Sequence, residues 1–183
     1  MKNAIILHGT SCTPNSYWQP KIKEFLESRG YEVWVPSLPN PDYPDLEVQL
    51  PFVLEKGVFN ENTILIGHFA GAPLILAILE KINKKIDKAI LIAGYARPKG
   101  ENSEPEKILK EKYNWEKIKN NVKDITFINS DNDPWGCNDS EGKYMFDNAG
   151  GRLIILHGEG HMGSDQFSQP YKEFPLIEKL IEM

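Results

Sequence analysis

The sequence has little of what several classes of protein require. Only two cysteines, Cys12 and Cys137, occur among 183 residues, which argues against a disulfide framework. Basic residues are not in surplus, because 21 Lys and Arg stand against 26 Asp and Glu and leave a net charge of −5. The chain therefore lacks the positive surface that neutralises phosphates, and we expect no nucleic-acid partner.

Long apolar runs are also missing. The run at the start, Ala4–Leu7, ends at His8-Gly9 and is too short for a membrane span or the apolar region of a secretory signal. We therefore expect a cytoplasmic protein that has no membrane partner. The sequence does not indicate a protein partner.

What the sequence does contain is a series of short apolar runs separated by helical patterns. The runs are rich in Ile, Val and Leu and lack alternation, as in strands buried on both faces. They are Ala4–Leu7, Glu32–Val35, Thr63–Ile66, Lys88–Ile92, Ile125–Ile128 and Arg152–Leu156. Helical spacing occurs over Trp18–Leu26, Ala72–Ile82, Trp115–Val122 and Tyr171–Ile181. The alternation predicts a three-layer α/β fold over residues 1–183, with six mostly parallel strands and helices on both faces.

Two stretches are predicted to be loops. Pro36–Asp45 and Tyr95–Pro105 are rich in proline or glycine, which excludes regular structure. Both follow strands, at the carboxyl edge where open α/β sheets build their sites. They are either plain connections or the lining of a substrate site.

The most informative segment is Gly67-His68-Phe69-Ala70-Gly71, between a buried strand and an apolar helix. This is the layout of a nucleophile elbow, G-x-S-x-G. The sharp turn requires the two glycines and aims the Ala70 amide at a developing oxyanion. Phe69, at its centre, has no atom that can attack a carbonyl. Taken alone, the glycines could also end a strand in an unrelated α/β fold.

An acid and a histidine follow in the order of a catalytic triad. Asp133 comes after the fifth run and is preferred to Asp131, because Pro134 fixes the next turn; Asp131 is expected to cap or close that turn. His161 lies in a glycine-rich loop after the last run, whereas His157 is expected to be structural. Asp133 would hold the imidazole's tautomer and His161 would act as the general base.

The turn His8-Gly9-Thr10 after the first run is the remaining motif of the candidate active site. Such a turn commonly provides a second oxyanion amide, here that of Thr10. We expect His8 itself to be a structural histidine.

These motifs together resemble the small YdeN-type serine hydrolases of the α/β-hydrolase superfamily, the family of the retinoblastoma-binding serine hydrolase. The matching segments are Ile5–Gly9, Tyr31–Pro36, Gly67–Gly71, Asp131–Pro134 and Gly160-His161. The resemblance implies a fold without a large cap domain and hydrolysis of small-molecule esters or amides with no cofactor or metal. It assigns Asp133 and His161 to the triad, but not the nucleophile, because the chain departs from the family at Phe69.

Three explanations of Phe69 are open. The chain is an engineered or recently diverged variant of an active enzyme, or a pseudoenzyme that kept the fold for binding, or another residue attacks. Ser11, Cys12 and Cys137 are the candidates for such a nucleophile, although none lies on a strand-to-helix elbow. Retention of the acid, the histidine and both glycines favours the first explanation.

The corresponding functions are an inactive or crippled carboxylesterase-like hydrolase and a binding module for a small molecule or a protein. A third candidate function is ligand binding by an unrelated flavodoxin-like protein. It would need a phosphate-cradling loop after the first run, and no G-x-G-x-x-G occurs.

Overall fold

The computed structural model describes residues 1–99 and 106–183, which form a sheet of six parallel strands. The strand order is β2-β1-β3-β4-β5-β6, and every neighbouring pair is parallel. The strands are β1 (Asn3–Leu7), β2 (Glu32–Trp34), β3 (Thr63–His68), β4 (Ile86–Ile92), β5 (Val122–Ser130) and β6 (Arg152–Leu156). The six predicted strands and their parallel pairing are thus confirmed.

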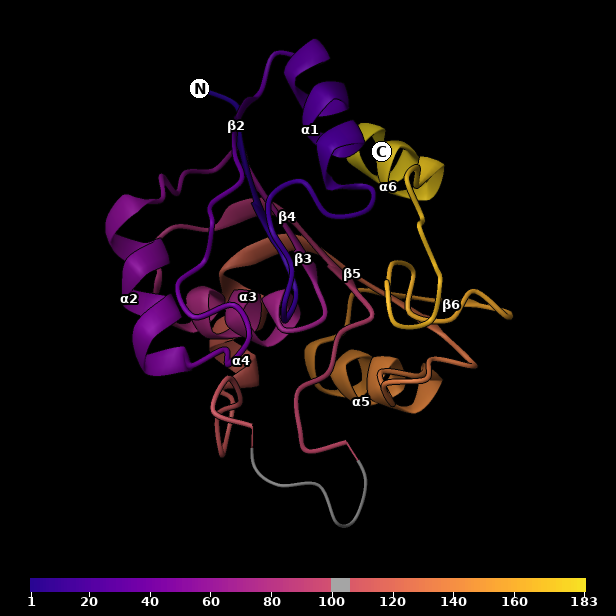
Figure 1. Ribbon diagram of the computed structural model, residues 1–183. Helices are drawn as coiled ribbons and strands as arrows, with labels where there is room; N and C mark the ends of the chain where they lie inside the picture. The colour runs from indigo at the N-terminus through magenta and orange to yellow at the C-terminus, as the bar shows by residue number, and fades with distance from the viewer. Residues whose placement is uncertain (100–105) are drawn as a thin grey trace.

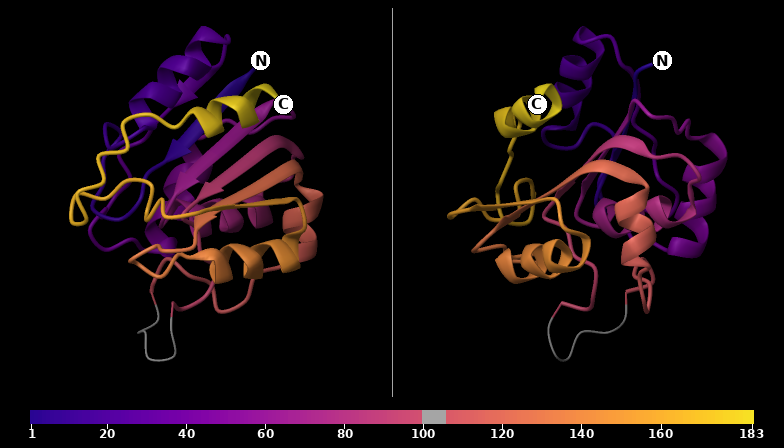
Figure 2. Two further views of the ribbon diagram at one scale, coloured as in Figure 1. Left: turned by 90° about the vertical axis from the view of Figure 1, so that its right-hand side faces the viewer. Right: turned by 180° about the vertical axis from the view of Figure 1, so that it is seen from behind.

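Helices cover both faces of the sheet (Figure 1). One face carries α1 (Gln19–Ser28) and α6 (Pro175–Glu182), and the other carries α2 (Leu46–Lys56), α3 (Gly71–Lys81), α4 (Trp115–Asn120) and α5 (Asp139–Ala149). Figure 2 shows the strands running side by side between these two layers. The described residues contain no cap domain, and the three-layer α/β architecture predicted from the sequence is confirmed.

The core lies between the central strands and α3. Every residue of β1 and of β3 is buried, and α3 is buried over almost its whole length. Two other helices of the same layer, α2 and α4, both contact α3. Near-continuous apolar sequence in β1, β3 and α3 follows from this burial, because these elements have no face toward water.

Two predicted helices have wrong limits. The helix predicted over Trp115–Val122 ends at Asn120, and Val122 instead begins β5, where it pairs with Ile86. The last helix begins at Pro175 and not at Tyr171, because a residue that precedes proline is held away from helical backbone.

Helices α2 and α5 were not predicted at all. The first carries Pro51 in its interior, which obscures a helical pattern. The second is mostly polar and contains Gly142, so its apolar periodicity is weak. Cap signals were nevertheless present, because Asp45 and Asn138 each accept a hydrogen bond from the first turn of the helix that follows.

The first predicted loop is confirmed, since residues 36–45 are irregular and end where α2 begins. In the second, residues 95–99 are irregular, and the rest of Tyr95–Pro105 lies outside the described residues. No helix in the described part of the chain is long and apolar enough to cross a membrane.

Candidate active site

The turn between β3 and α3 has the geometry of a nucleophile elbow. Phe69 lies between the two elements with a positive φ of 51°, a conformation that side chains with a Cβ rarely adopt. A Cβ on Gly67 would come within 2.6 Å of the carbonyl oxygen of Gly71. A Cβ on Gly71 would overlap the carbonyl oxygen of Leu7 in β1. Both glycines are therefore required for β3, α3 and β1 to approach so closely.

The acid and the histidine meet at the carboxyl edge of the sheet. His161 Nδ1 lies 2.8 Å from Asp133 Oδ2, and both side chains are buried. The other oxygen of Asp133 accepts a hydrogen bond from the Trp135 amide at 2.8 Å. Because two loops after different strands converge on this pair, its geometry depends on the folded sheet.

The expectation for Asp131 was wrong. Asp133, not Asp131, closes the turn after β5. Asp131 instead reaches the loop after β6, where it accepts a hydrogen bond from the Gly158 amide at 2.9 Å and pairs with His157 at 2.5 Å. These two hydrogen bonds, that from Gly158 first, lower the pKa of Asp131, and its bond to His157 raises the pKa of that exposed imidazole.

The ring of Phe69 lies directly beside the His161 imidazole. Their centroids are 4.7 Å apart and their planes are nearly perpendicular, at 81°. The ring also contacts Tyr95, at 5.4 Å between centroids, and Trp135, at 6.4 Å. The Lys99 ammonium lies 3.6 Å from the Tyr95 centroid and 4.9 Å from that of Phe69. Phe69 thus occupies the space in front of the imidazole.

The two predicted oxyanion amides flank this elbow. Ala70 is the N-cap residue of α3, so its amide lies at the positive end of the helix dipole. Thr10 follows Gly9, where a Cβ would come 3.0 Å from the Cβ of Phe69. Among the hydrogen bonds between described residues, none uses the N–H of Thr10 or of Ala70. Both amides thus keep an unused donor within the described part of the chain.

Two further histidines are structural. His8 accepts a hydrogen bond from the Leu38 amide at Nε2, 3.0 Å away, and its Nδ1 lies 2.9 Å from the carbonyl oxygen of Gly9. Burial lowers the pKa of His8, so the ring bonds in its neutral form. The expected structural role of His8 is thus confirmed.

His68 plays a part that sequence reasoning missed. Its Nε2–H donates to the backbone carbonyl oxygen of His161 at 2.9 Å, which ties the elbow to the histidine loop. Complete burial, and then the neighbouring His161, lower the pKa of His68 to about 3. The residue preceding the elbow centre therefore acts as a neutral hydrogen-bond donor.

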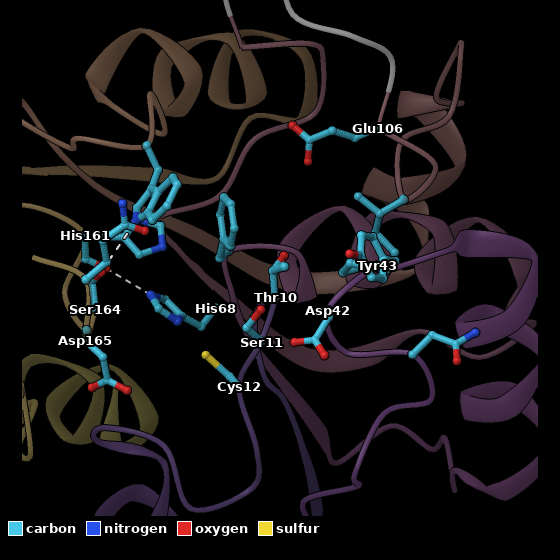
Figure 3. A pocket seen from close by; sticks show the side chains of 18 of the residues that line it. Thr10, Ser11, Cys12, Asp42, Tyr43, His68, Glu106, His161, Ser164 and Asp165 are labelled. Atoms are coloured by element: carbon cyan, nitrogen blue, oxygen red, sulfur yellow. Dashed lines mark hydrogen bonds between the residues drawn. The ribbon is translucent and has the colours of Figure 1, made fainter.

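A cavity of about 960 Å³ opens beside these residues. Figure 3 shows His161 and His68 on one side of it and Asp42, Tyr43 and Glu106 on the other. The loop over residues 36–45 contributes five lining residues, Asn40, Asp42, Tyr43, Pro44 and Asp45. This loop therefore lines the candidate site and is not a plain connection.

The alternative nucleophiles lack the contacts that would activate them, although Ser11 and Cys12 line the same cavity as His161. Burial raises the pKa of the Cys12 thiol and holds that of Cys137 well above its usual range, which suppresses the reactive thiolate. Ser11 is exposed. Between residues in the described ranges, no hydrogen bond joins any of the three side chains to His161.

The described residues contain no group of three or more His, Cys, Asp or Glu side chains that could hold a metal ion. The polar groups around Phe69 are instead the His–Asp pair and the two amides. These are the donors and acceptors of acyl-transfer chemistry.

Comparisons with known proteins show which family the chain resembles. The sequence pattern of the family described as Serine hydrolase matches residues 4–182. YdeN of Bacillus subtilis (strain 168) is 33% identical over 99 residues, which are 52% of this chain and 52% of YdeN. Serine hydrolase RBBP9 of Rattus norvegicus is 27% identical over 157 residues, or 83% of this chain and 81% of that protein.

Solved structures agree on the fold. The crystal structure of the B. subtilis ydeN gene product superposes with a TM-score of 0.89 at 24% identity, over 100% of this chain and 97% of that one. Est1E from Butyrivibrio proteoclasticus with bound ferulic acid superposes with a TM-score of 0.68 at 14% identity, over 100% and 87%.

Proposed function

Because the chain belongs to the serine hydrolase family, we propose that it is a framework for hydrolysing small-molecule esters or amides in which Phe69 has replaced the nucleophile. The observation that carries this proposal is the position of Phe69. It has the strained backbone of an elbow residue, its ring lies 4.7 Å from the His161 imidazole, and the neighbouring amides have no partner among the described residues.

The roles of the other residues follow from the chemistry of acyl transfer. Asp133 orients the imidazole through Nδ1 and leaves Nε2 to take a proton from a hydroxyl at position 69. The amides of Thr10 and Ala70 would stabilise the negative charge that develops on the carbonyl oxygen. No step requires a cofactor.

With phenylalanine at position 69 no acyl-enzyme can form at the elbow. Loss of a triad serine leaves the contribution of the oxyanion hole and of binding, about 10³–10⁴-fold over water. The ring also occupies the place where a substrate carbonyl would approach the imidazole. The chain as written is therefore proposed to be inactive or crippled toward esters.

A serine-directed fluorophosphonate probe tests the proposal. The Phe69→Ser variant is expected to become covalently labelled and the parent chain is not, and Phe69→Ser with His161→Ala should lose the labelling. Robust ester turnover by the parent that Cys12→Ala or Ser11→Ala abolishes would contradict the proposal and reveal another nucleophile.

A binding function is the second candidate, and the cavity favours it. About 960 Å³ remains open with the Phe69 ring in its wall, a size typical of small-molecule sites. A Phe69→Ser variant that folds normally but never becomes labelled would favour this binding role. A cytoplasmic location and a single domain over residues 1–183 remain predictions from the sequence.

A further inference from the structure

The loop that carries His161 is held by an unusual series of hydrogen bonds. Four consecutive backbone N–H groups, those of residues 158–161, each donate to a side chain. The pairs are Gly158 with Asp131 Oδ1 (2.9 Å), Glu159 with Ser130 Oγ (3.0 Å), Gly160 with Asn132 Oδ1 (2.8 Å) and His161 with Gln169 Oε1 (2.9 Å).

Three of these acceptors are consecutive residues, Ser130–Asn132, and they directly precede Asp133. Each residue of the segment that leads to Asp133 therefore accepts a hydrogen bond from the segment that leads to His161. Ser130 Oγ–H also donates to Asn132 Oδ1 at 2.8 Å, so two of the acceptors are themselves connected. These hydrogen bonds between the two segments, together with the bond between Asp133 and His161 themselves, set the distance between the acid and the histidine.

We infer that Ser130 and Asn132 are positioning residues for the His161 imidazole. Asn132 receives the amide of Gly160, the residue immediately before His161, and Gly160 has a positive φ of 57°. Rotation of that peptide would swing the histidine away from Asp133. Asp131 holds the amide of Gly158, three residues before His161, so its effect on the imidazole is smaller.

This inference depends on the proposed role of His161 as the base, but its first test does not require an active enzyme. NMR of the chain as written would follow the ring nitrogens of His161 and the Nδ1 proton that bonds to Asp133. In Asn132→Ala that proton should exchange faster with water and shift upfield. Asn132→Asp keeps an oxygen in place and should restore the protected signal.

Asn138 provides a matched control. Its Oδ1 also accepts from a backbone amide and a serine hydroxyl, both of Ser140, but it caps α5 and not the histidine loop. Asn138→Ala should therefore leave the His161 signals unchanged even though a helix cap is lost. Ser130→Ala is a second test variant, in which the Nδ1 proton should again lose protection.

The inference is overturned if the His161 signals of Asn132→Ala and Ser130→Ala match those of the parent, or if Asn138→Ala disturbs them equally. In the Phe69→Ser background, Asn132→Ala should slow probe labelling roughly 10- to 100-fold, because small misplacements of reacting groups have effects of this size. Unchanged labelling with altered NMR signals would also contradict it. If Phe69→Ser itself never becomes labelled, the proposed function fails while the NMR result still decides the positioning role.

Discussion

Phe69 combines an unfavourable backbone conformation with favourable packing of its ring. A residue held at positive φ costs on the order of 1–3 kcal/mol, and φ is 51° here. The ring packs against Tyr95, Trp135 and His161 but is only partly buried, so it contributes at most the roughly 1.5–3 kcal/mol of a fully buried side chain. The two terms nearly offset each other, so the fold tolerates phenylalanine at a position that usually carries serine.

The first prediction follows from this balance. Phe69→Ser should change the free energy of unfolding by no more than about 2 kcal/mol, because serine keeps the backbone cost and loses only the packing of a partly buried ring. Urea unfolding of the two forms would measure this. A loss much larger than this would mean that the aromatic cluster, and not the sheet and helices, holds the elbow in place.

The pKa of His68 leads to a prediction about acid stability. Its folded value of about 3 lies below the 6.5 of an unperturbed histidine, so a proton binds the unfolded chain more readily. The stabilising contribution is therefore complete above pH 6.5 and is lost as the pH falls from 6.5 toward 3. The total is on the order of a few kcal/mol, since one pKa unit corresponds to about 1.4 kcal/mol.

His68→Gln should weaken this dependence. The urea midpoint of each protein would be measured at neutral and at mildly acidic pH. The decrease in midpoint between the two pH values should be larger for the parent than for the variant, whatever the stability of each at neutral pH. The carboxylates and His8 are present in both proteins, so their contributions cancel in the difference. Parallel pH profiles would mean that His68 does not carry the effect.

At the residue scale, the sequence predicted the groups of the proposed chemistry but not the groups that hold them in place. Gly67, Gly71, Asp133 and His161 stand in spaced motifs whose chemistry is general. The contacts of Asn132 and Gln169 with the histidine loop depend on how two loops meet after folding. A polar side chain in a turn has many local uses, and nothing in the sequence selects the distant amide that it will bind.

At the level of elements, the strands were predictable because burial on both faces leaves an uninterrupted apolar run. The helices were less so. Where a helix packs on the sheet with a nearly continuous apolar sequence, as α3 does, its helical spacing and apolar composition identified it. For α2 and α5 tertiary packing outweighs weak local patterns, and only their cap residues, Asp45 and Asn138, marked them.

The close approach of α3 to β1 supports a prediction about Gly71. Alanine there would push its Cβ into the carbonyl oxygen of Leu7, and neither element can shift without disturbing the sheet. Gly71→Ala should therefore cost about 3 kcal/mol or more in the free energy of unfolding. Gly30 is the contrasting control, because its φ is +80° and a Cβ there would meet nothing within 4 Å.

Gly30→Ala should cost about 1–2 kcal/mol, the strain of a left-handed residue alone. Thermal or urea unfolding of both variants separates a steric clash from backbone strain. Equal losses in the two variants would contradict the tight contact between α3 and β1.

On the scale of the whole molecule, the strand order brings loops from distant parts of the sequence to one edge of the sheet. The turns after β1, β3, β5 and β6 supply Thr10, Phe69, Asp133 and His161 in that order. A site assembled in this way exists only when the complete sheet has formed. Its geometry must therefore respond to contacts that join the layers, even where those contacts touch no substrate.

Trp18 is such a contact and supports the final prediction. It is fully buried at the start of α1, packs against His68 and Phe174, and donates its Nε1–H to the carbonyl oxygen of Met162 at 3.1 Å. It thus joins α1, the elbow, the histidine loop and the segment leading into α6. Trp18→Phe keeps an aromatic ring but removes the donor and leaves a buried carbonyl group unpaired.

The unpaired carbonyl should cost about 1–3 kcal/mol, and the smaller ring adds a packing defect. Trp34→Phe is the matched control. Trp34 lies half-buried on the edge strand β2, beside Phe52 of α2, and its indole N–H makes no hydrogen bond within the described residues. Urea unfolding should show a clearly larger loss for Trp18→Phe. In the Phe69→Ser background the same variant should slow probe labelling, since Met162 adjoins His161. Equal stability losses, or labelling that is unaffected, would mean that the histidine loop keeps its position without support from α1.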